Sequence, residues 1–340
     1  MIMRIALVSK LWEETSSNSR GGTGSSVGQL ANELVRRGHK VTIFGTANSN
    51  TRAKLVAVQP RPFRGDYSEI REYMNIAEAF KREKDFDIIN THVEHKACFF
   101  APLVKTPTLV TIRYGEFFKH ETELLRANKN LNFSANSQAL KARLSFLRWR
   151  GHVYNGVDLD LFRFNDQPRD YLLFLGRISP QKGVDAAIRA AKRLKKKLII
   201  AGKMVDEDAE FLQKKVIPHI DGKLIVYRGE VGLSAKIKLL QNAEAVLQPI
   251  QYFEACSNTI IEAMACGTPA VAFNKGSNRE LILDKKTGFV VKNEAQMIAA
   301  LKKISDIKRG DCRRRAEKLF SVERMADGYL ALYKKIKKRK

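Results

Sequence analysis

Short runs of branched apolar residues alternate with helix-forming segments along this sequence, and the alternation pauses near residue 155 before it restarts at residue 171. The first half opens with a strand pattern over residues 4–9, a helical pattern over 27–35 that ends before Gly38, and a second strand pattern over 41–44. Further strands are expected at residues 87–90, 109–112 and 132–134. Because a helical crossover between two strands makes those strands parallel, this order predicts a doubly wound parallel sheet.

The second half repeats the same order after a turn-rich joint. Strands are expected at residues 171–176, 198–202, 224–229, 245–250 and 270–273, with helices over 184–194, 209–216, 234–242 and 260–267. A chain of 340 residues can bury two cores. We therefore expect two Rossmann-like α/β domains, residues 1–158 and 159–320, and a basic helix over 321–340 that packs back on the first domain. Ligands of doubly wound sheets bind beyond the carboxyl ends of the strands, so a cleft between the domains is expected to hold the chemistry.

The amino-acid composition bears on the localisation of the protein and on whether it has disulfides or a zinc site. No run of about 18 apolar residues is present, and the first ten residues lack the features of a secretory signal, so we expect a cytoplasmic protein that does not span a membrane. No two cysteines have the C-x-x-C spacing, so neither a disulfide framework nor a zinc site is expected. These cysteines are Cys98, Cys256, Cys266 and Cys312.

The formal net charge of +25 is the compositional anomaly, with +9 in residues 1–165 and +16 in residues 166–340. Basic clusters occur at residues 192–197, 313–315 and 334–340. They fit solvated helix faces, contact with an anionic membrane surface or an anionic acceptor, or contact with nucleic acid. No nucleic-acid-binding motif accompanies them, so nucleic acid is not an expected partner.

The sharpest local signal is the stretch FEACSNTIIEAMACGTPAVAF, which begins at residue 253. Glu254 and Glu262 are eight residues apart, which on one helix would be a rise of about 12 Å with the side chains off one face. Glu254 is therefore expected on a loop, with Ser257 or Asn258 as the N-cap of a following helix. The first-turn N–H groups, which include that of Thr259, are suited to an anionic diphosphate.

At this point the sequence resembles family 4 of the glycosyltransferases, which have the two-domain GT-B fold. The family motif E-x7-E followed by A-x-A-C-G-x-P is similar to residues 254–269 here. The resemblance covers almost the whole chain. It extends to Gly21 and Gly22, residues 155–158, Gly176 with Arg177, Lys182 with Gly183, and residues 287–289.

The resemblance implies a retaining, metal-independent transfer of a sugar from a nucleoside diphosphate sugar to a hydroxyl acceptor. Arg177 and Lys182 would neutralise the leaving diphosphate, a role that suits two cations near a helix start. Glu262 would bind the ribose and Glu254 the donor sugar. Further donor contacts are implied for Gly21, Gly22, Gly176, Arg228 and Val231. No cofactor is expected, and the absence of a D-x-D pair in a suitable loop agrees with an absence of metal.

Two departures from the family pattern concern the sugar pocket. Residues 255–258 read ACSN where family members often have a Gly-Phe-Gly turn. Residues 111–115 read TIRYG, which puts Tyr114 where a histidine of many members reaches the donor sugar. A tyrosine donates a hydrogen bond but carries no positive charge. His92 is then the remaining histidine candidate in the first domain, although a buried structural role is the commoner one for such a residue.

Three other functions remain to be weighed. A nicotinamide dehydrogenase is disfavoured because no strand is followed by G-x-G-x-x-G with an acid about 20 residues later. A sugar-nucleotide epimerase would need catalytic acids in the first domain and lacks the paired glutamates. A non-catalytic protein that binds nucleotide sugars stays open because of the two departures.

Overall fold

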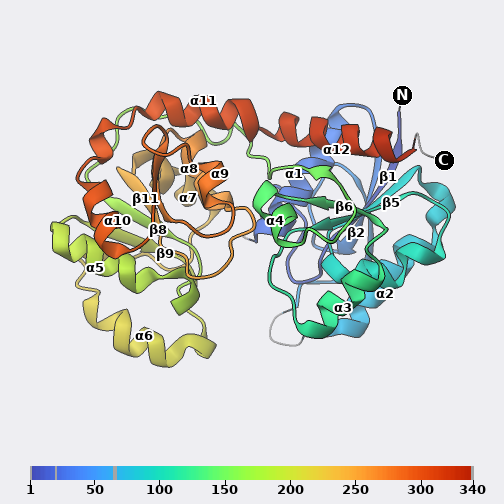
Figure 1. The fold of residues 1–340 in the computed structure, drawn as a ribbon, viewed down its shortest axis with the longest axis horizontal. Helices are drawn as coiled ribbons and strands as arrows, with labels where there is room; N and C mark the ends of the chain where they lie inside the picture. The colour runs from blue at the N-terminus through green and yellow to red at the C-terminus, as the bar shows by residue number, and fades with distance from the viewer. Residues whose placement is uncertain (1, 20, 64–66, 338–340) are drawn as a thin grey trace. The chain divides into compact units, whose positions relative to one another are not determined.

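The structure is a computed structural model, and it describes residues 2–19, 21–63 and 67–337. The chain divides into two compact units at Gly156–Val157 and again at Ser321–Val322. The first unit combines the residues up to Gly156 with those from Val322 onward, and the second comprises Val157–Ser321. Each unit has its own parallel sheet with helices on its faces (Figure 1).

The first sheet has the strand order β3-β2-β1-β4-β5-β6-β7 within the described residues, and every recorded pair is parallel. Its strands are β1 Arg4–Val8, β2 Lys40–Thr46, β3 Lys54–Gln59, β4 Ile88–Thr91, β5 Thr108–Ile112, β6 Asn132–Ala135 and β7 Trp149–His152. The chain order reverses between β1 and β4, so the loops after these two strands diverge to opposite faces of the sheet.

The helices of the first unit are α1 Gly22–Arg36, α2 Glu69–Lys81, α3 Lys119–Ala127, α4 Gln138–Arg143 and α12 Val322–Lys337, with short 3-10 turns η1 Glu83–Asp85, η2 Glu94–Phe99 and η3 Ala101–Leu103. In α1, Val27, Leu30 and Leu34 recur at helical spacing and are fully buried. The helix ends at Arg36, and Gly38 follows in the left-handed region with φ +82°.

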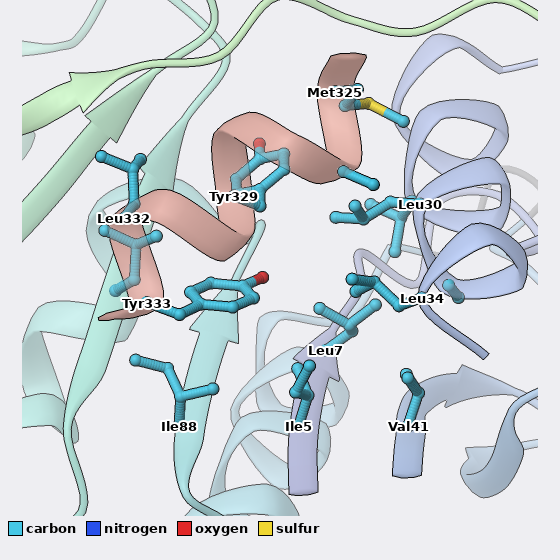
Figure 2. Packing of buried hydrophobic residues seen from close by; sticks show 14 of the residues in the cluster. Ile5, Leu7, Leu30, Leu34, Val41, Ile88, Met325, Tyr329, Leu332 and Tyr333 are labelled. Carbon is cyan, nitrogen blue, oxygen red and sulfur yellow. The ribbon is translucent and has the colours of Figure 1, made fainter. Parts of the chain in front are cut away.

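Helix α12 belongs to the core of the first unit although it is far from that unit in sequence. Figure 2 shows Tyr329 and Tyr333 on the side of α12 that faces β1 and α1, while Leu332, of the same buried cluster, lies against Gly151 of β7. The Tyr333 hydroxyl accepts a hydrogen bond of 2.8 Å from the Asn90 amide, and burial raises the pKa of Tyr333 far above its ordinary value. Core packing thus ties the last described helix to the first sheet.

The second sheet has the order β10-β9-β8-β11-β12-β13 within the described residues, again with parallel pairs. Its strands are β8 Leu172–Leu175, β9 Leu198–Ala201, β10 Ile225–Tyr227, β11 Ala245–Gln248, β12 Ala270–Phe273 and β13 Gly288–Val291. The order reverses between β8 and β11, which places the loops after these strands beside the switch point.

The helices of the second unit are α5 Val184–Leu194, α6 Ala209–Lys215, α7 Leu233–Asn242, α8 Asn258–Ala265, α9 Asn278–Leu281, α10 Glu294–Leu301 and α11 Arg309–Leu319. Short 3-10 turns are η4 Pro180–Lys182, η5 Asp206–Asp208, η6 Ile217–His219 and η7 Ile304–Asp306. The expected fold class, two doubly wound α/β domains, is confirmed.

None of the helices in residues 2–19, 21–63 and 67–337 combines the length and the apolar character that crossing a bilayer requires.

Candidate active site

Three polar side chains meet at the carboxyl edge of the second sheet. Lys182 ends η4 in the loop after β8, and Tyr252 and Glu254 lie in the loop after the neighbouring strand β11. The Lys182 ammonium lies 3.2 Å from a Glu254 carboxylate oxygen, and the Tyr252 hydroxyl donates to the same oxygen at 2.8 Å. Lys182 also donates to the Tyr252 hydroxyl, and its Nζ lies 4.8 Å from the Tyr252 ring centre. Because both charged side chains are largely buried, their pairing is less screened than that of a surface pair.

Two glycines permit the backbone that holds this cluster. Gly183 has φ +72°, and a Cβ there would lie 2.1 Å from the carbonyl oxygen of Pro249. Gly276 has φ +54°, and a Cβ there would lie 2.0 Å from the carbonyl oxygen of Glu254. A larger residue at either position would shift the loop that carries Lys182 or Glu254.

Helix α8 begins at Asn258, shortly after Glu254. Ser257 is its N-cap, because the serine Oγ accepts a 3.4 Å hydrogen bond from the Ile260 N–H. Of the two residues expected as the N-cap, Ser257 and Asn258, the first is therefore confirmed. Asn258 and Thr259 form the first turn, and the Thr259 hydroxyl lies 3.5 Å from the Leu175 carbonyl oxygen at the end of β8. The positive end of the α8 dipole thus lies at the carboxyl edge of the sheet.

Glu262 lies one turn into α8 and has its own cation. Lys236 of α7 donates to a Glu262 carboxylate oxygen at 2.8 Å, and both side chains are mostly buried. The two glutamates of the motif are therefore held by different lysines, Lys182 for Glu254 and Lys236 for Glu262. They are also on different elements, as the eight-residue spacing predicts.

Arg177 follows Gly176 at the end of β8 and is exposed. Its Nη2 donates to the Gln181 amide oxygen at 3.4 Å. Arg177 and Lys182 thus flank one turn, but among the recorded contacts only Lys182 reaches Glu254. Gly176 itself adopts φ +151°, which allows the backbone to leave the strand sharply.

Arg228 and Val231, for which donor contacts are implied, line an open pocket of about 400 Å³ in the second unit. One face of α7 and the middle of β9 form its walls, and neither Glu254 nor Glu262 is among the lining residues. The other lining residues are Arg169, Tyr171, Ile199, Ala235, Lys238, Leu239 and Asn242.

In the first unit, Gly21 is the N-cap of α1 and Gly22 is its first residue. The space beside Gly21 is filled by the Glu13 side chain, since a Cβ on Gly21 would lie 1.0 Å from the carboxylate. The other Glu13 oxygen accepts a 2.7 Å hydrogen bond from the Gly24 N–H. Burial raises the pKa of Glu13, and this effect outweighs the lowering by the Gly24 N–H and by Lys10.

No contact between His92 and Tyr114 is recorded within the described residues. His92 is fully buried, and its Nδ1 accepts a 3.2 Å hydrogen bond from Arg113 Nε. Burial first, and then the charge of Arg113, lowers the pKa of His92 well below its ordinary value, so the imidazole is neutral with its proton on Nε2. Tyr114 is 45% exposed.

Most of the basic clusters have partners within the protein. Arg313 donates to the carbonyl oxygens of Phe162 and Ala265, and Arg315 to that of Leu281. In the terminal cluster, Lys335 donates to the Arg150 carbonyl oxygen at 3.3 Å. The last three residues of that cluster, 338–340, lie outside the described residues.

Four residues that take part in these sites were not predicted from the sequence. Tyr252 lies two positions before Glu254. Side chains two positions apart in an extended segment point to the same side, so this spacing could have indicated their contact. The other three residues meet their partners only in the tertiary structure, and no sequence motif includes them. They are Lys236, Glu13 and Arg113. Across residues 2–19, 21–63 and 67–337, no three His, Cys, Asp or Glu side chains gather in a way that could hold a metal ion.

Comparison with known proteins places both units among sugar transferases. Residues 20–161 match the family model described as Glycosyltransferase Family 4, and residues 162–319 match the model described as Glycosyl transferases group 1. The chain is 27% identical to the putative glycosyltransferase YtcC of Bacillus subtilis over 41% of its length and 40% of that protein. It is 25% identical to a glycogen synthase of Mycobacterium tuberculosis over 89% of its length and 86% of that protein.

Among solved structures, the chain resembles Alr3699/HepE of Anabaena in complex with UDP-glucose. The TM-score is 0.75 at 16% identity, over 96% of this chain and 98% of that chain. At this identity the likeness concerns the fold, and it agrees with the GT-B architecture expected from the sequence.

Proposed function

The chain belongs to the glycosyltransferases of family 4, and we propose that it moves a sugar from a nucleoside diphosphate sugar to a hydroxyl acceptor with retention at the anomeric carbon. The observation that carries this proposal is the arrangement around α8. Glu254 precedes the N-terminus of the helix and Glu262 follows it by one turn, each with its own lysine. One elongated ligand that has an anionic middle and hydroxyl groups at both ends matches this order.

The diphosphate is the anionic middle of that ligand. The α8 dipole and the cations Arg177 and Lys182 stabilise the negative charge that grows on the leaving phosphate when the glycosidic bond breaks. Lys182 is already oriented by Glu254 and Tyr252, so little reorganisation is needed at the moment of reaction. In this proposal protein cations replace a divalent metal.

The two ends of the ligand carry hydroxyl groups. Glu254 accepts hydrogen bonds from hydroxyls of the donor sugar, and Glu262 accepts them from the ribose. The complex of Alr3699/HepE contains UDP-glucose, which supports a nucleotide sugar as the class of donor.

Retention follows from attack on the same face from which the phosphate departs. The acceptor hydroxyl approaches the anomeric carbon, and an oxygen of the leaving phosphate takes its proton. The protein supplies position and charge stabilisation, and no side chain forms a bond to the sugar. An inverted product by NMR, or a glycosyl group trapped on a carboxylate, would contradict this mechanism.

The acceptor is proposed to be anionic or held at an anionic membrane surface on the cytoplasmic side. The net charge of +25 supports this, since a strongly basic protein concentrates anionic partners near its surface.

Glu262→Ala and Glu254→Ala test the proposed division of the ligand. Without Glu262 the ribose loses its hydrogen bonds to a charged acceptor, which costs about 1.5–3 kcal/mol, or roughly 10- to 150-fold in affinity for the free nucleoside diphosphate. Without Glu254 that affinity stays nearly intact while transfer falls steeply, because the sugar is no longer oriented. Calorimetry with nucleoside diphosphates and turnover with a panel of nucleotide sugars measure the two effects.

Glu244→Ala is the matched control, because Glu244 pairs with Lys196 in the same unit and precedes β11, whereas Glu254 follows that strand. Equal losses of nucleotide affinity in both motif variants would refute the division. Nucleotide binding by the wild type without any transfer would favour the non-catalytic binding protein instead.

A further inference from the structure

Three aromatic side chains meet at the carboxyl edge of the first sheet and form what is here the aromatic platform. Trp12 lies in the loop after β1, and Phe63 and Tyr67 lie between β3 and α2. The rings of Trp12 and Tyr67 are nearly parallel, with centres 4.6 Å apart and planes inclined by 17°. Phe63 meets both rings edge-on, with its centre 6.2 Å from that of Trp12 and 5.4 Å from that of Tyr67.

The aromatic platform is fixed to the core of the unit and is open to solvent. Leu11 is fully buried, and its carbonyl oxygen accepts a 3.1 Å hydrogen bond from the Phe63 N–H, so the two loops that carry the rings are joined. The Trp12 side chain is nevertheless 53% exposed. Because Tyr67 covers one face of the indole, the exposed surface comprises the other face and the edges. A rigid, flat aromatic surface loses little conformational entropy when a ligand covers it.

Charged groups lie directly beside the rings. The Tyr67 hydroxyl donates to a Glu72 carboxylate oxygen at 3.1 Å and accepts from the Lys96 ammonium. Lys96 also pairs with Glu72, and both side chains are buried. Glu69, whose side chain is mostly exposed, lies 3.4 Å from Lys96. One ammonium and two carboxylates give this group a net charge of −1, and the carboxylate of Glu69 is the one that a ligand can reach from solvent.

A ligand that matches this surface has a flat apolar face and hydroxyl groups at its rim. A sugar ring has this form, because C–H groups gather on one of its faces while its hydroxyls point outward. The C–H groups are weakly positive and are attracted to the negative face of an indole, and the hydroxyls can donate to an exposed carboxylate. The net charge of −1 opposes an anion at this place. A hydrocarbon chain would put the same charges beside an apolar medium, which is costly.

We propose that a neutral sugar ring of the acceptor stacks on the exposed face of Trp12, with Glu69 accepting hydrogen bonds from its hydroxyl groups. The inference rests on the proposed function and makes it more specific, because the acceptor is then a glycan or a glycoside. The negative charge proposed above for the acceptor belongs to a part of it beyond this ring. Tyr67 is a positioning residue, since it supports the indole from the opposite face.

Tryptophan fluorescence tests binding at the aromatic platform without any need for turnover. The chain contains two tryptophans. The second is Trp149 of β7, whose indole N–H donates to the Leu144 carbonyl oxygen at 3.0 Å. In a full-length Trp149→Phe protein the emission therefore comes from Trp12. Titration with neutral methyl glycosides and disaccharides is expected to change this emission until the site is saturated, whereas nucleosides and phosphatidylcholine vesicles are expected to leave it unchanged.

Calorimetry with the same saccharides then compares variants of the platform. We expect Trp12→Ala to weaken saccharide binding about 10-fold and Trp12→Phe, which keeps a smaller ring, about 3-fold. Glu69→Gln is expected to weaken it about 3-fold, because an amide oxygen is a poorer acceptor than a carboxylate. Phe99→Ala is the matched control, because Phe99 is 51% exposed in the same unit and its ring contacts Tyr73. The affinity for a nucleoside diphosphate should stay that of the wild type in all four variants.

Saccharide binding that Trp12→Ala weakens and Phe99→Ala does not weaken supports the inference, and it does so even if the protein transfers no sugar and the proposed function fails. In a protein that transfers sugar, a KM for a saccharide acceptor that rises about 10-fold in Trp12→Ala, with unchanged nucleotide affinity, supports it further. The inference is overturned if no saccharide changes the Trp12 emission, or if vesicles or nucleosides change it instead. It is also overturned if Trp12→Ala binds saccharides as the wild type does.

Discussion

Helices α1 and α8 both follow a central strand of a parallel sheet, yet different groups accept hydrogen bonds from the first-turn amides at their N-termini. At α8 the N-cap is Ser257, a neutral hydroxyl that satisfies one amide. At α1 the N-cap is Gly21, which has no side chain, and the carboxylate of Glu13 reaches in from the preceding loop. A hydroxyl leaves the helix dipole uncompensated, whereas a carboxylate compensates it. The two ends therefore differ in how open they are to an incoming anion.

The cations at the two edges differ in the same sense. Lys182 is paired with Glu254 directly, so its charge and that of the glutamate form one unit. Arg113 is oriented by neutral groups, His92 and Asn155, and keeps its charge for another partner. The second unit thus offers a charged pair beside an open helix end, and the first offers a filled helix end and a guanidinium for which no carboxylate partner is recorded among the described residues.

The largest effect is expected at the charged pair. Lys182→Met removes the cation beside the leaving phosphate and should lower turnover by about 10²- to 10³-fold, the usual cost of losing one preorganised stabilising group. Steady-state kinetics with the donor sugar measure this loss. Lys192→Met is the control, because Lys192 is exposed on α5 and lies 3.4 Å from His219. A loss of turnover of less than about 3-fold would show that Lys182 does not take part in the reaction.

A smaller effect is expected when α8 is made to resemble α1. Ser257→Asp puts a carboxylate at the open helix end, and Asp caps helices as well as Ser does, so the fold should stay stable within about 0.5 kcal/mol. The affinity for a nucleoside diphosphate should fall about 10-fold by calorimetry, because the new charge opposes the diphosphate. Ser257→Asn, which caps without charge, should bind as the wild type does. Equal affinities for the Asp and Asn variants would show that the α8 terminus does not hold the diphosphate.

The third effect is on stability rather than on ligand binding or turnover, and it concerns the neutral support of Arg113. Burial holds the pKa of His92 far below its ordinary value of about 6.5, so the unfolded chain binds a proton there that the folded protein rejects. Its contribution to stability is therefore full above pH 6.5 and is lost as the pH falls below it, by up to about 1.4 kcal/mol per pH unit. His92→Asn keeps an acceptor for Arg113 and removes this dependence. Urea unfolding between pH 5 and 7 compares the two proteins, and parallel pH profiles would contradict a neutral buried His92.

The sequence predicts the central strands of both sheets well and misses three strands at the edges. Strands β3, β7 and β13 were not expected, and each is at the end of its sheet. β7 reads WRGH and has no continuous apolar run, whereas β3 contains one over residues 55–58 but is half exposed along its length. A central strand of a parallel sheet is buried on both faces and therefore has an apolar run that can be recognised. An edge strand can lack this signal, as β7 does, although β10 at the end of the second sheet was expected from the sequence.

The candidate sites divide in a similar way. Glu254, Ser257 and Glu262 could be found because one loop and one helix place them, and local spacing then decides their geometry. The Glu13 carboxylate reaches an amide 11 positions away, and Arg113 is oriented by residues 21 and 42 positions away. Such contacts depend on which strands become neighbours, and no local pattern of residues contains that information.

The position of α12 affects the order in which the protein can fold during synthesis. The core around β1 includes Met325, Tyr329 and Tyr333, so it lacks part of its packing until the ribosome has made residues beyond 321. The second unit, Val157–Ser321, is continuous in sequence and contains its own sheet. Domains usually complete their folding in the order in which they are translated. Here the unit that emerges first is completed last, and until then its nascent sheet leaves on one face the apolar surface that α12 covers.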